Sequence, residues 1–150
     1  MNNCVEVLSI HLQIQQALAL LARAMDNRDW LAFRQLLASD VTADFGFGLI
    51  NGQDALIEFI RSFLDKCGIT QHLIGSIVVE IDENMREAKS RAYVNDLHLS
   101  SDGTSSAWLR TLGDYHDQWI KVDERWLLKD RIKLNRAYAG TMDVFAGKKS

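Results

Sequence analysis

The sequence predicts an α+β fold, because segments with helical periodicity come first and segments with strand character follow. In the first part, apolar residues recur at spacings of three and four, as in helices that bury one face. The second part is rich in β-branched and aromatic residues and is divided by short polar turns. We therefore expect three N-terminal helices packed on a mostly antiparallel sheet, in one domain over residues 1–150.

Three helices are expected, over residues 5–26, 30–37 and 54–66. The first has one apolar face, made by Val7, Ile10, Ile14, Leu18, Leu21 and Met25. Asp29 has the residue type and position of an N-cap for the second helix. Gly68 follows the third helix where a C′ glycine would end it. Each helix thus has either a clear apolar stripe or a terminal signal.

The strands are expected at residues 41–47, 69–82, 89–100, 104–122 and 126–134, the last four forming an antiparallel meander. Asp102-Gly103 predicts a tight hairpin between two of them, with Ser101 opposite Thr104. In that register Asn95 faces Arg110 and Asp96 faces Leu109. One face then carries Tyr93, Asn95, Leu97, Trp108, Arg110 and Leu112, and the other carries Ala92, Val94, Asp96, His98, Leu109, Thr111 and Tyr115.

Composition and charge exclude several classes of function. Of the 150 residues, 47% are hydrophobic and 25% are charged, which is ordinary for a soluble globular domain. The net charge of −3 argues against a nucleic-acid or anionic-membrane partner, since no basic stripe is present. With two cysteines and no signal-peptide pattern, we expect a cytoplasmic protein that does not interact with a membrane.

His72 and Asp26 are the candidate catalytic residues. His72 stands at the start of a predicted strand, where an imidazole would enter the core. Asp26 ends the first helix, where the macrodipole disfavours a carboxylate. A carboxylate that accepts a hydrogen bond from one ring nitrogen fixes the tautomer and raises the basicity of the other, as a general base requires. The alternatives are that His72 is a satisfied core histidine and that Asp26 belongs to a polar turn with Arg23 or Arg28.

Other kinds of chemistry lack their motifs. The four histidines show no H-x-H or HExxH spacing, and neither cysteine has a second cysteine nearby, so no metal site and no cofactor are expected. No G-x-S-x-G element is present for a serine nucleophile. FGFG at residues 45–48 lacks the lysine and the spacing of a phosphate-binding loop.

Aromatic residues and one arginine are candidates for ligand contacts. Trp30, Phe33, Phe59, Phe63 and Trp126 stand at positions typical of core packing. Phe45, Phe47, Tyr93, Trp108 and Trp119 lie on predicted strands, and we expect two or three of them to line a cavity. Arg131 is either an ion-pair partner of Asp130 or of a neighbouring strand, or an anchor for an anionic group of a ligand.

Several stretches together resemble the SnoaL-like branch of the superfamily that includes nuclear transport factor 2, ketosteroid isomerase and scytalone dehydratase. They are ALLARAMDNRDWLAFRQLLASDV, DALIEFIRSFL, TQHLIGSIVVEID and GDYHDQWIKVDERWLLKDR. The resemblance covers a core of about residues 9–138 and implies a cone-shaped α+β barrel, in which helices pack on a strongly curved sheet around an internal cavity. It also implies a homodimer that pairs through the open faces of the sheets.

The resemblance assigns roles to individual residues. The helix-end aspartate of the family's dehydratases falls on Asp26, the strand histidine on His72, a polar residue of the next strand on Asn95, and the last-strand arginine on Arg131. The tyrosine expected five residues before the aspartate is replaced by Leu21, which removes a proton donor. Tyr93 or Tyr115 would have to supply one from another wall.

These observations lead to one preferred function and one alternative. The preferred function is a cofactor-independent lyase or isomerase, of dehydratase or cyclase type, acting on a small hydrophobic cyclic or polyketide-like substrate. His72 and Asp26 would form the base, while Asn95, Arg131, Tyr93, Trp108 and Phe45 would bind the substrate. The alternative is a non-catalytic ligand-binding or scaffolding module, including a role like that of the small subunit of ring-hydroxylating dioxygenases.

Overall fold

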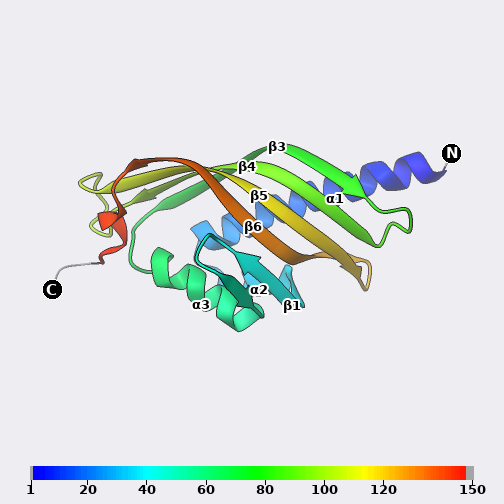
Figure 1. The fold of residues 1–150 in the computed structure, drawn as a ribbon, viewed down its shortest axis with the longest axis horizontal. Coiled ribbons are helices and arrows are strands. Elements are labelled where there is room, and N and C mark those ends of the chain that lie inside the picture. The colour runs from blue at the N-terminus through cyan, green and yellow to red at the C-terminus, as the bar shows by residue number, and fades with distance from the viewer. Residues whose placement is uncertain (1, 148–150) are drawn as a thin grey trace.

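The computed structural model describes residues 2–147 and consists of helices packed under one long, curved sheet (Figure 1). The α-helices are α1 (Asn2–Asp26), α2 (Trp30–Gln35) and α3 (Gln53–Leu64), and a 3₁₀ helix, η1 (Met142–Phe145), lies near the C-terminus. The strands are β1 (Leu37–Asp44), β2 (Leu49–Asn51), β3 (Thr70–Ile81), β4 (Glu87–Leu99), β5 (Trp108–Val122) and β6 (Arg125–Gly140). The predicted α+β class and three N-terminal helices are confirmed.

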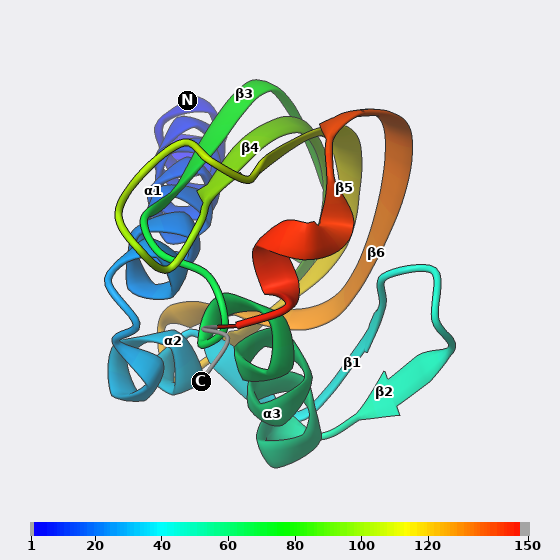
Figure 2. The same ribbon diagram turned by 90° about the vertical axis from the view of Figure 1, so that its left-hand side faces the viewer.

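The sheet has six strands in the order β2-β1-β6-β5-β4-β3. The meander from β3 to β6 is antiparallel, as predicted, but β1 joins it in parallel beside β6 and β2 extends it at the edge. The sheet bends into an arc, with α1 and α3 on its open side (Figure 2). The sheet is not closed on itself, and the predicted fold of helices packed on a strongly curved, cone-like sheet is confirmed.

The last strand and the hairpin before β5 differ from the prediction. β6 continues to Gly140, six residues past the predicted end, because it stays paired with β5 as far as Leu109. The predicted two-residue turn at Asp102 is instead a loop over residues 100–107. Oδ1 of Asp102 accepts hydrogen bonds from the hydroxyls of Ser100, at 2.6 Å, and Thr104, at 2.7 Å. These side-chain bonds stabilise a longer loop in place of ladder pairs.

The longer loop shifts the β4–β5 register by two residues. Asn95 faces Leu112 and Asp96 faces Thr111, where Arg110 and Leu109 were predicted. Because side chains alternate with a period of two, a shift of two leaves every residue on its predicted face. Ala92, Val94, Asp96, His98, Leu109, Thr111 and Tyr115 are accordingly all buried.

The core lies between α1 and the concave face of the sheet. Ile10, Ile14, Leu18 and Leu21 of α1 are almost fully buried. By length and apolar composition, α1 could also cross a membrane, a test that core helices pass too. Burial within the domain accounts for one apolar face of α1, whereas Val5, Leu8 and Leu12 of the same helix are exposed. The C-terminal end of α1 places Asp26 beside the start of β3.

Candidate active site

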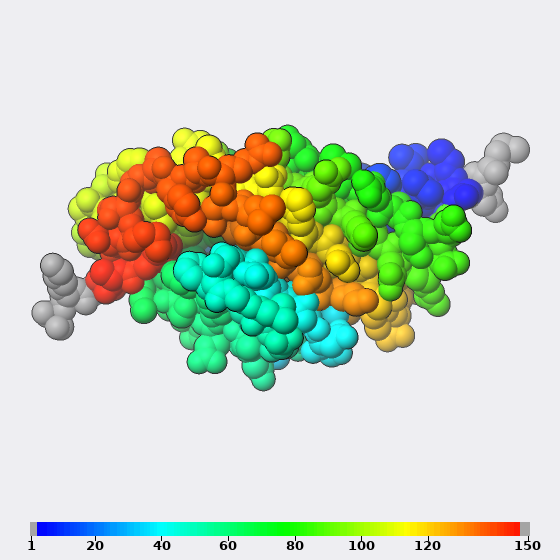
Figure 3. Space-filling model, viewed as in Figure 1, coloured from blue at the N-terminus to red at the C-terminus, as the bar shows by residue number. Residues whose placement is uncertain are grey.

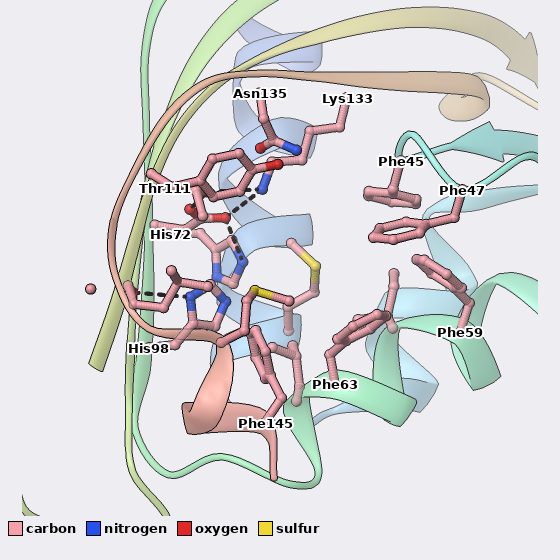
Figure 4. Close-up of a pocket in the computed structure, with 18 of the residues that line it drawn as sticks. Phe45, Phe47, Phe59, Phe63, His72, His98, Thr111, Lys133, Asn135 and Phe145 are labelled. Carbon is pink, nitrogen blue, oxygen red and sulfur yellow. Dashed lines mark hydrogen bonds and ion pairs between the residues drawn. The ribbon is translucent and has the colours of Figure 1, made fainter. Parts of the chain in front are cut away.

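A cavity of about 440 Å³ opens between the concave face of the sheet, α3 and η1. Its lining includes residues of the turn between β1 and β2 and of the segment around η1, which are neighbours on the surface (Figure 3). The two sides of the cavity differ in character: phenylalanine rings lie on one side and ionisable side chains on the other (Figure 4). The volume falls in the usual range of small-molecule sites.

The apolar side is a cluster of Phe45, Phe47, Phe59, Phe63 and Phe145 in mutual contact. The rings of Phe45 and Phe59 stack with centroids 5.4 Å apart, and those of Phe63 and Phe145 meet edge to face at 5.3 Å. Phe45 was predicted to line a cavity and does so. Phe59 and Phe63 were predicted to fill the core, but they project from α3 into the cavity, because the sheet curves away from this helix.

The predicted pair of Asp26 and His72 meets at the end of α1. Nδ1 of His72 lies 2.7 Å from Oδ1 of Asp26, and the His72 backbone N–H donates to Oδ2 at 3.0 Å. The hydroxyl of Thr70 donates to Oδ1 at 2.8 Å. These three hydrogen bonds hold a carboxylate at a helix C-terminus, where the macrodipole opposes it.

Arg28 fixes the position of this pair, although it makes no contact with the Asp26 carboxylate. Its guanidinium donates to Thr70 Oγ1 at 2.8 Å and to the carbonyl oxygens of Met25 at 2.9 Å and Gly68 at 2.7 Å. Arg28 thereby ties the end of α1 to the segment that begins β3. Arg28 also donates to the Asp26 carbonyl oxygen at 3.3 Å, so it contacts Asp26 through the backbone of a partly buried turn and not as an ion-pair partner of the carboxylate.

The hydrogen bonds also determine the protonation of the pair. Burial alone would raise the pKa of Asp26, but the hydrogen bonds from His72 and Thr70 outweigh it and lower that pKa below its ordinary value. An ionised carboxylate only accepts, so Nδ1 of His72 carries the proton that it donates. In the neutral form of the imidazole, the lone pair is then on Nε2. His72 lines the cavity (Figure 4), whereas Asp26 does not.

A second buried carboxylate lies beside His72 in the cavity wall. Oδ2 of Asp96 is 3.7 Å from His72 Nε2 and accepts a hydrogen bond from the Lys133 ammonium at 2.6 Å. Thr111 donates to the other oxygen. Burial would raise the pKa of Asp96, but the charges of Lys133 and of a protonated His72, together with these hydrogen bonds, lower it, so the carboxylate is ionised.

His98 completes this wall, two residues along β4 from Asp96. Its Nδ1 lies 3.4 Å from the carbonyl oxygen of Leu109, which can only accept, so Nδ1 carries the proton. Its ring meets those of His72, with centroids 5.6 Å apart, and Phe145, at 5.1 Å. Burial lowers the pKa of His98 from 6.5 to about 4, so this imidazole is neutral near pH 7.

Three residues predicted to bind substrate lie outside the cavity. Tyr93, Asn95 and Trp108 are on the outer, convex face of the sheet, because they have the parity opposite to the buried residues of β4 and β5. Asn95 accepts a hydrogen bond from Arg110 there, at 2.8 Å, and Arg136 lies over the Tyr93 ring. Their predicted role in this cavity is therefore wrong.

Arg131 also fails to reach the cavity. It is buried and binds Asp117 through two hydrogen bonds of 2.8 and 2.7 Å, with its guanidinium over the Tyr115 ring. The ion-pair partner of Arg131 is thus Asp117 of the neighbouring strand β5, whereas the other predicted option was Asp130. Because Nε and Nη2 of Arg131 both donate to the buried Asp117 carboxylate, the guanidinium is held in the core, away from the cavity.

The position of the expected tyrosine is occupied by Leu21, which is fully buried in the core. Tyr115, one of the two proposed substitutes, lines the cavity from β5, whereas Tyr93 does not. Burial raises the pKa of the Tyr115 phenol. Tyr115 is therefore a neutral hydroxyl group on the cavity wall.

The prediction missed Asp96, His98, Lys133 and Asn135 as site residues. A signal existed for the first two, because both were placed on the buried face of β4, where ionisable residues are rare. Lys133 and Asn135 could not be found in the same way, since a bulge opposite Gln118 and Trp119 reverses the alternation of β6, and Asn135 lies just past the predicted end at Leu134.

Comparison with known proteins supports the fold and identifies the protein family. The family model of the SnoaL-like domain matches residues 6–132. No curated protein sequence matches the chain. Among solved structures, a protein of Novosphingobium aromaticivorans provisionally named scytalone dehydratase is 18% identical with a TM-score of 0.83, covering 94% of this chain and 92% of its own.

Two further structures have the same architecture. A hexachlorocyclohexane dehydrochlorinase, LinA type 2, is 14% identical with a TM-score of 0.80, covering 91% of this chain and 92% of its own. A protein of Streptomyces avermitilis, provisionally named a dehydratase of the NTF2-like family, is 13% identical with a TM-score of 0.73 and covers 83% and 95%. At these identities the similarity shows the fold alone.

Proposed function

This chain belongs to the SnoaL-like domain family, and we propose that it is a cofactor-independent lyase or isomerase in which His72 is the general base. The observation that carries the proposal is the hydrogen bond between His72 Nδ1 and Asp26, which leaves Nε2 as the basic atom of an imidazole that lines the cavity. A base that is oriented by a carboxylate and enclosed by apolar side chains is suited to removing a proton from carbon.

The cavity indicates the class of substrate. Five phenylalanine rings favour a small hydrophobic, cyclic molecule, or a folded polyketide-like chain, over a sugar or a nucleotide. On the other side, Lys133 donates to Asp96 and Thr111, and an ammonium group has three N–H bonds. The third N–H is then available for an oxygen of the substrate, and the Asn135 amide lies on the same wall.

The reaction follows from these positions. His72 Nε2 takes a proton from the carbon next to a carbonyl group, and the Asp26 carboxylate stabilises the imidazolium that forms. Lys133 and Asn135 take the role that the prediction gave to Asn95 and Arg131, namely to hold the carbonyl oxygen while it gains negative charge. In a lyase the electron pair then forms a C=C bond and expels a group from the next carbon, whereas in an isomerase His72 returns the proton to another carbon.

A non-catalytic ligand-binding module is the second candidate, favoured by Leu21 at the position where the family's dehydratases have a tyrosine. Such a module needs the aromatic cluster but not the hydrogen-bonded His72 and Asp26. It would bind small cyclic molecules without turning them over. The two candidates therefore differ in one measurable property, the dependence of product formation on His72.

The test is an elimination assay with two probes. Hexachlorocyclohexane, after which one of the similar dehydrochlorinases is named, reports the loss of HCl as released chloride, and a cyclic β-hydroxyketone reports the loss of water as enone absorbance. We expect turnover of at least one probe by the wild type, a loss of about 10²–10⁴-fold in His72→Asn, and no loss in Tyr93→Phe on the outer face. Turnover that is absent, or unchanged in His72→Asn, would refute the proposal.

A further inference from the structure

Three potential metal ligands converge on the polar wall of the cavity. One ligand atom each of His72, Asp96 and His98 lies within 4.8 Å of the others, and all three residues are buried. They come together because His72 pairs with Asp96 across β3 and β4, while His98 follows two residues later on the same face. Linear motifs such as H-x-H could not reveal this set, since its two histidines are 26 positions apart.

Both imidazoles are fixed in the orientation of metal ligands. Nδ1 of His72 is held by the Asp26 carboxylate, and Nδ1 of His98 by the carbonyl oxygen of Leu109. In metal sites, a ligating histidine almost always donates its other ring N–H to a carboxylate or to a backbone carbonyl. The structure contains one example of each. His72 Nε2 faces Oδ2 of Asp96 (Figure 4), and each neutral ring has its lone pair on Nε2.

The spacing of the ligand atoms also suits a metal ion. His72 Nε2 and Asp96 Oδ2 are 3.7 Å apart. Two ligands that are each about 2.1 Å from a tetrahedral ion lie roughly 3.4 Å from each other. A small inward shift of either side chain would bring the pair to that distance.

The Lys133 ammonium is the obstacle to such an ion, because it already binds Asp96 Oδ2 at 2.6 Å. A carboxylate oxygen has two lone pairs, so Lys133 can remain as an outer partner, but its positive charge repels a second cation nearby. Lys133 thus lowers the affinity for a metal ion but does not block Nε2 of either histidine.

We propose that His72, Asp96 and His98 form a binding site for a divalent transition metal ion of the Zn²⁺ class, and that Lys133 restrains its affinity. Two imidazole nitrogens and one carboxylate oxygen are a ligand set that Zn²⁺ and its neighbours accept, with the remaining positions open to the cavity. Because the ion takes the lone pair of His72 Nε2, metal binding and proton abstraction by His72 exclude each other. The ion is therefore an inhibitor of the proposed base and not its cofactor.

The experiment is titration of the full chain with Co²⁺, followed by the visible absorption of the bound ion and by calorimetry, in a Cys4→Ser background that removes the exposed thiol. We expect one Co²⁺ per chain with the strong bands of four- or five-coordinate cobalt, and displacement by Zn²⁺. Lys133→Met should bind at least about tenfold more tightly, because the repelling charge is gone. His98→Gln and Asp96→Asn should each lose this binding.

His116→Gln is the matched control, since this histidine lies on β5 outside the site and should leave binding unchanged. Circular dichroism establishes that each variant is folded. The proposal would be overturned if neither the wild type nor Lys133→Met bound Co²⁺. It would also be overturned if binding survived in His98→Gln or was lost in His116→Gln. The readout needs no substrate, so its failure is distinguishable from failure of the proposed base.

Discussion

Nδ1 of His72 lies 2.7 Å from Oδ1 of Asp26, joining the first residues of β3 to the last residue of α1. The two side chains are 46 positions apart in the sequence and belong to different layers of the fold. Their contact turns an isolated strand histidine into an imidazole with one defined tautomer. The proposed proton abstraction depends on that tautomer.

Asp26→Asn should therefore disturb the His72 ring. A carboxylate only accepts hydrogen bonds, whereas an amide can also donate, so the variant no longer enforces the proton on Nδ1. We expect ¹⁵N NMR of the imidazole to show the Nδ1–H form in the wild type and a mixture or the Nε2–H form in the variant. The same ring signals in both proteins would contradict the assigned role of Asp26.

His98 should make the protein less stable in mild acid. Its pKa is lowered from 6.5 to about 4 by burial, so between these values the unfolded chain binds a proton that the folded chain does not. The stability associated with neutral His98 is thus complete above about pH 6.5 and is lost as the pH falls toward 4, by about 3 kcal/mol. Urea unfolding from pH 7.5 to 4.5 measures this loss.

His98→Gln is the control for that prediction, because glutamine does not titrate. The free energy of unfolding of the variant should vary about 3 kcal/mol less than that of the wild type over the same range. Equal pH dependence in the two proteins would show that His98 is not buried in neutral form.

Asp117→Asn should destabilise the fold strongly, because it leaves the Arg131 guanidinium buried without its partner. Breaking a buried ion pair from one side typically costs about 3–5 kcal/mol. The matched control is Arg136→Met, which breaks the exposed pair with Asp114 and should cost at most about 1 kcal/mol. Equal losses in urea unfolding would contradict the structural role given to Arg131.

The outer face of the sheet leads to a prediction about assembly. Leu73, Tyr93, Leu97, Leu112, Ile132 and Leu134 are exposed there, each by more than a third. These apolar side chains, interspersed with Asn95, Arg110 and Asp114, favour pairing with a second copy of the chain, as expected from the family resemblance. Light scattering should give about twice the chain mass of 17.0 kDa.

Leu112→Glu should reduce that mass to one chain, since it places a charge in the middle of the outer face. Leu31→Glu, also exposed but on α2, should remain dimeric. A monomeric wild type, or a dimer that persists in Leu112→Glu, would refute this arrangement.

The sequence predicted the inward-facing residues better than the strand ends. Alternation along β4 and β5 placed Asp96, His98 and Thr111 on the buried face, and a register shift of two residues did not change this. The contact of Asp26 with His72 was predicted because a helix end and a strand start are local signals that the family resemblance brought together.

The remainder of the site depends on long-range geometry. Lys133 and Asn135 line the cavity because a bulge opposite Gln118 and Trp119 reverses the alternation of β6, and Asn135 also lies past the predicted end of that strand. Phe59 and Phe63 have the helical spacing of core residues, and only the curvature of the sheet opens a cavity beside them. Neither effect has a signature in the local sequence.

Proton abstraction by His72 can be measured without knowledge of the natural substrate by using nitrobenzisoxazole, a flat aromatic probe of general bases. Removal of its ring C–H proton forms a C≡N bond and breaks the N–O bond, releasing a coloured phenolate whose oxygen Lys133 can stabilise. We expect the wild type to accelerate this reaction and His72→Asn to lose about 10²–10⁴-fold of the rate, while Leu31→Glu loses none. Equal rates for the wild type and His72→Asn would show that the imidazole in this cavity is not a base.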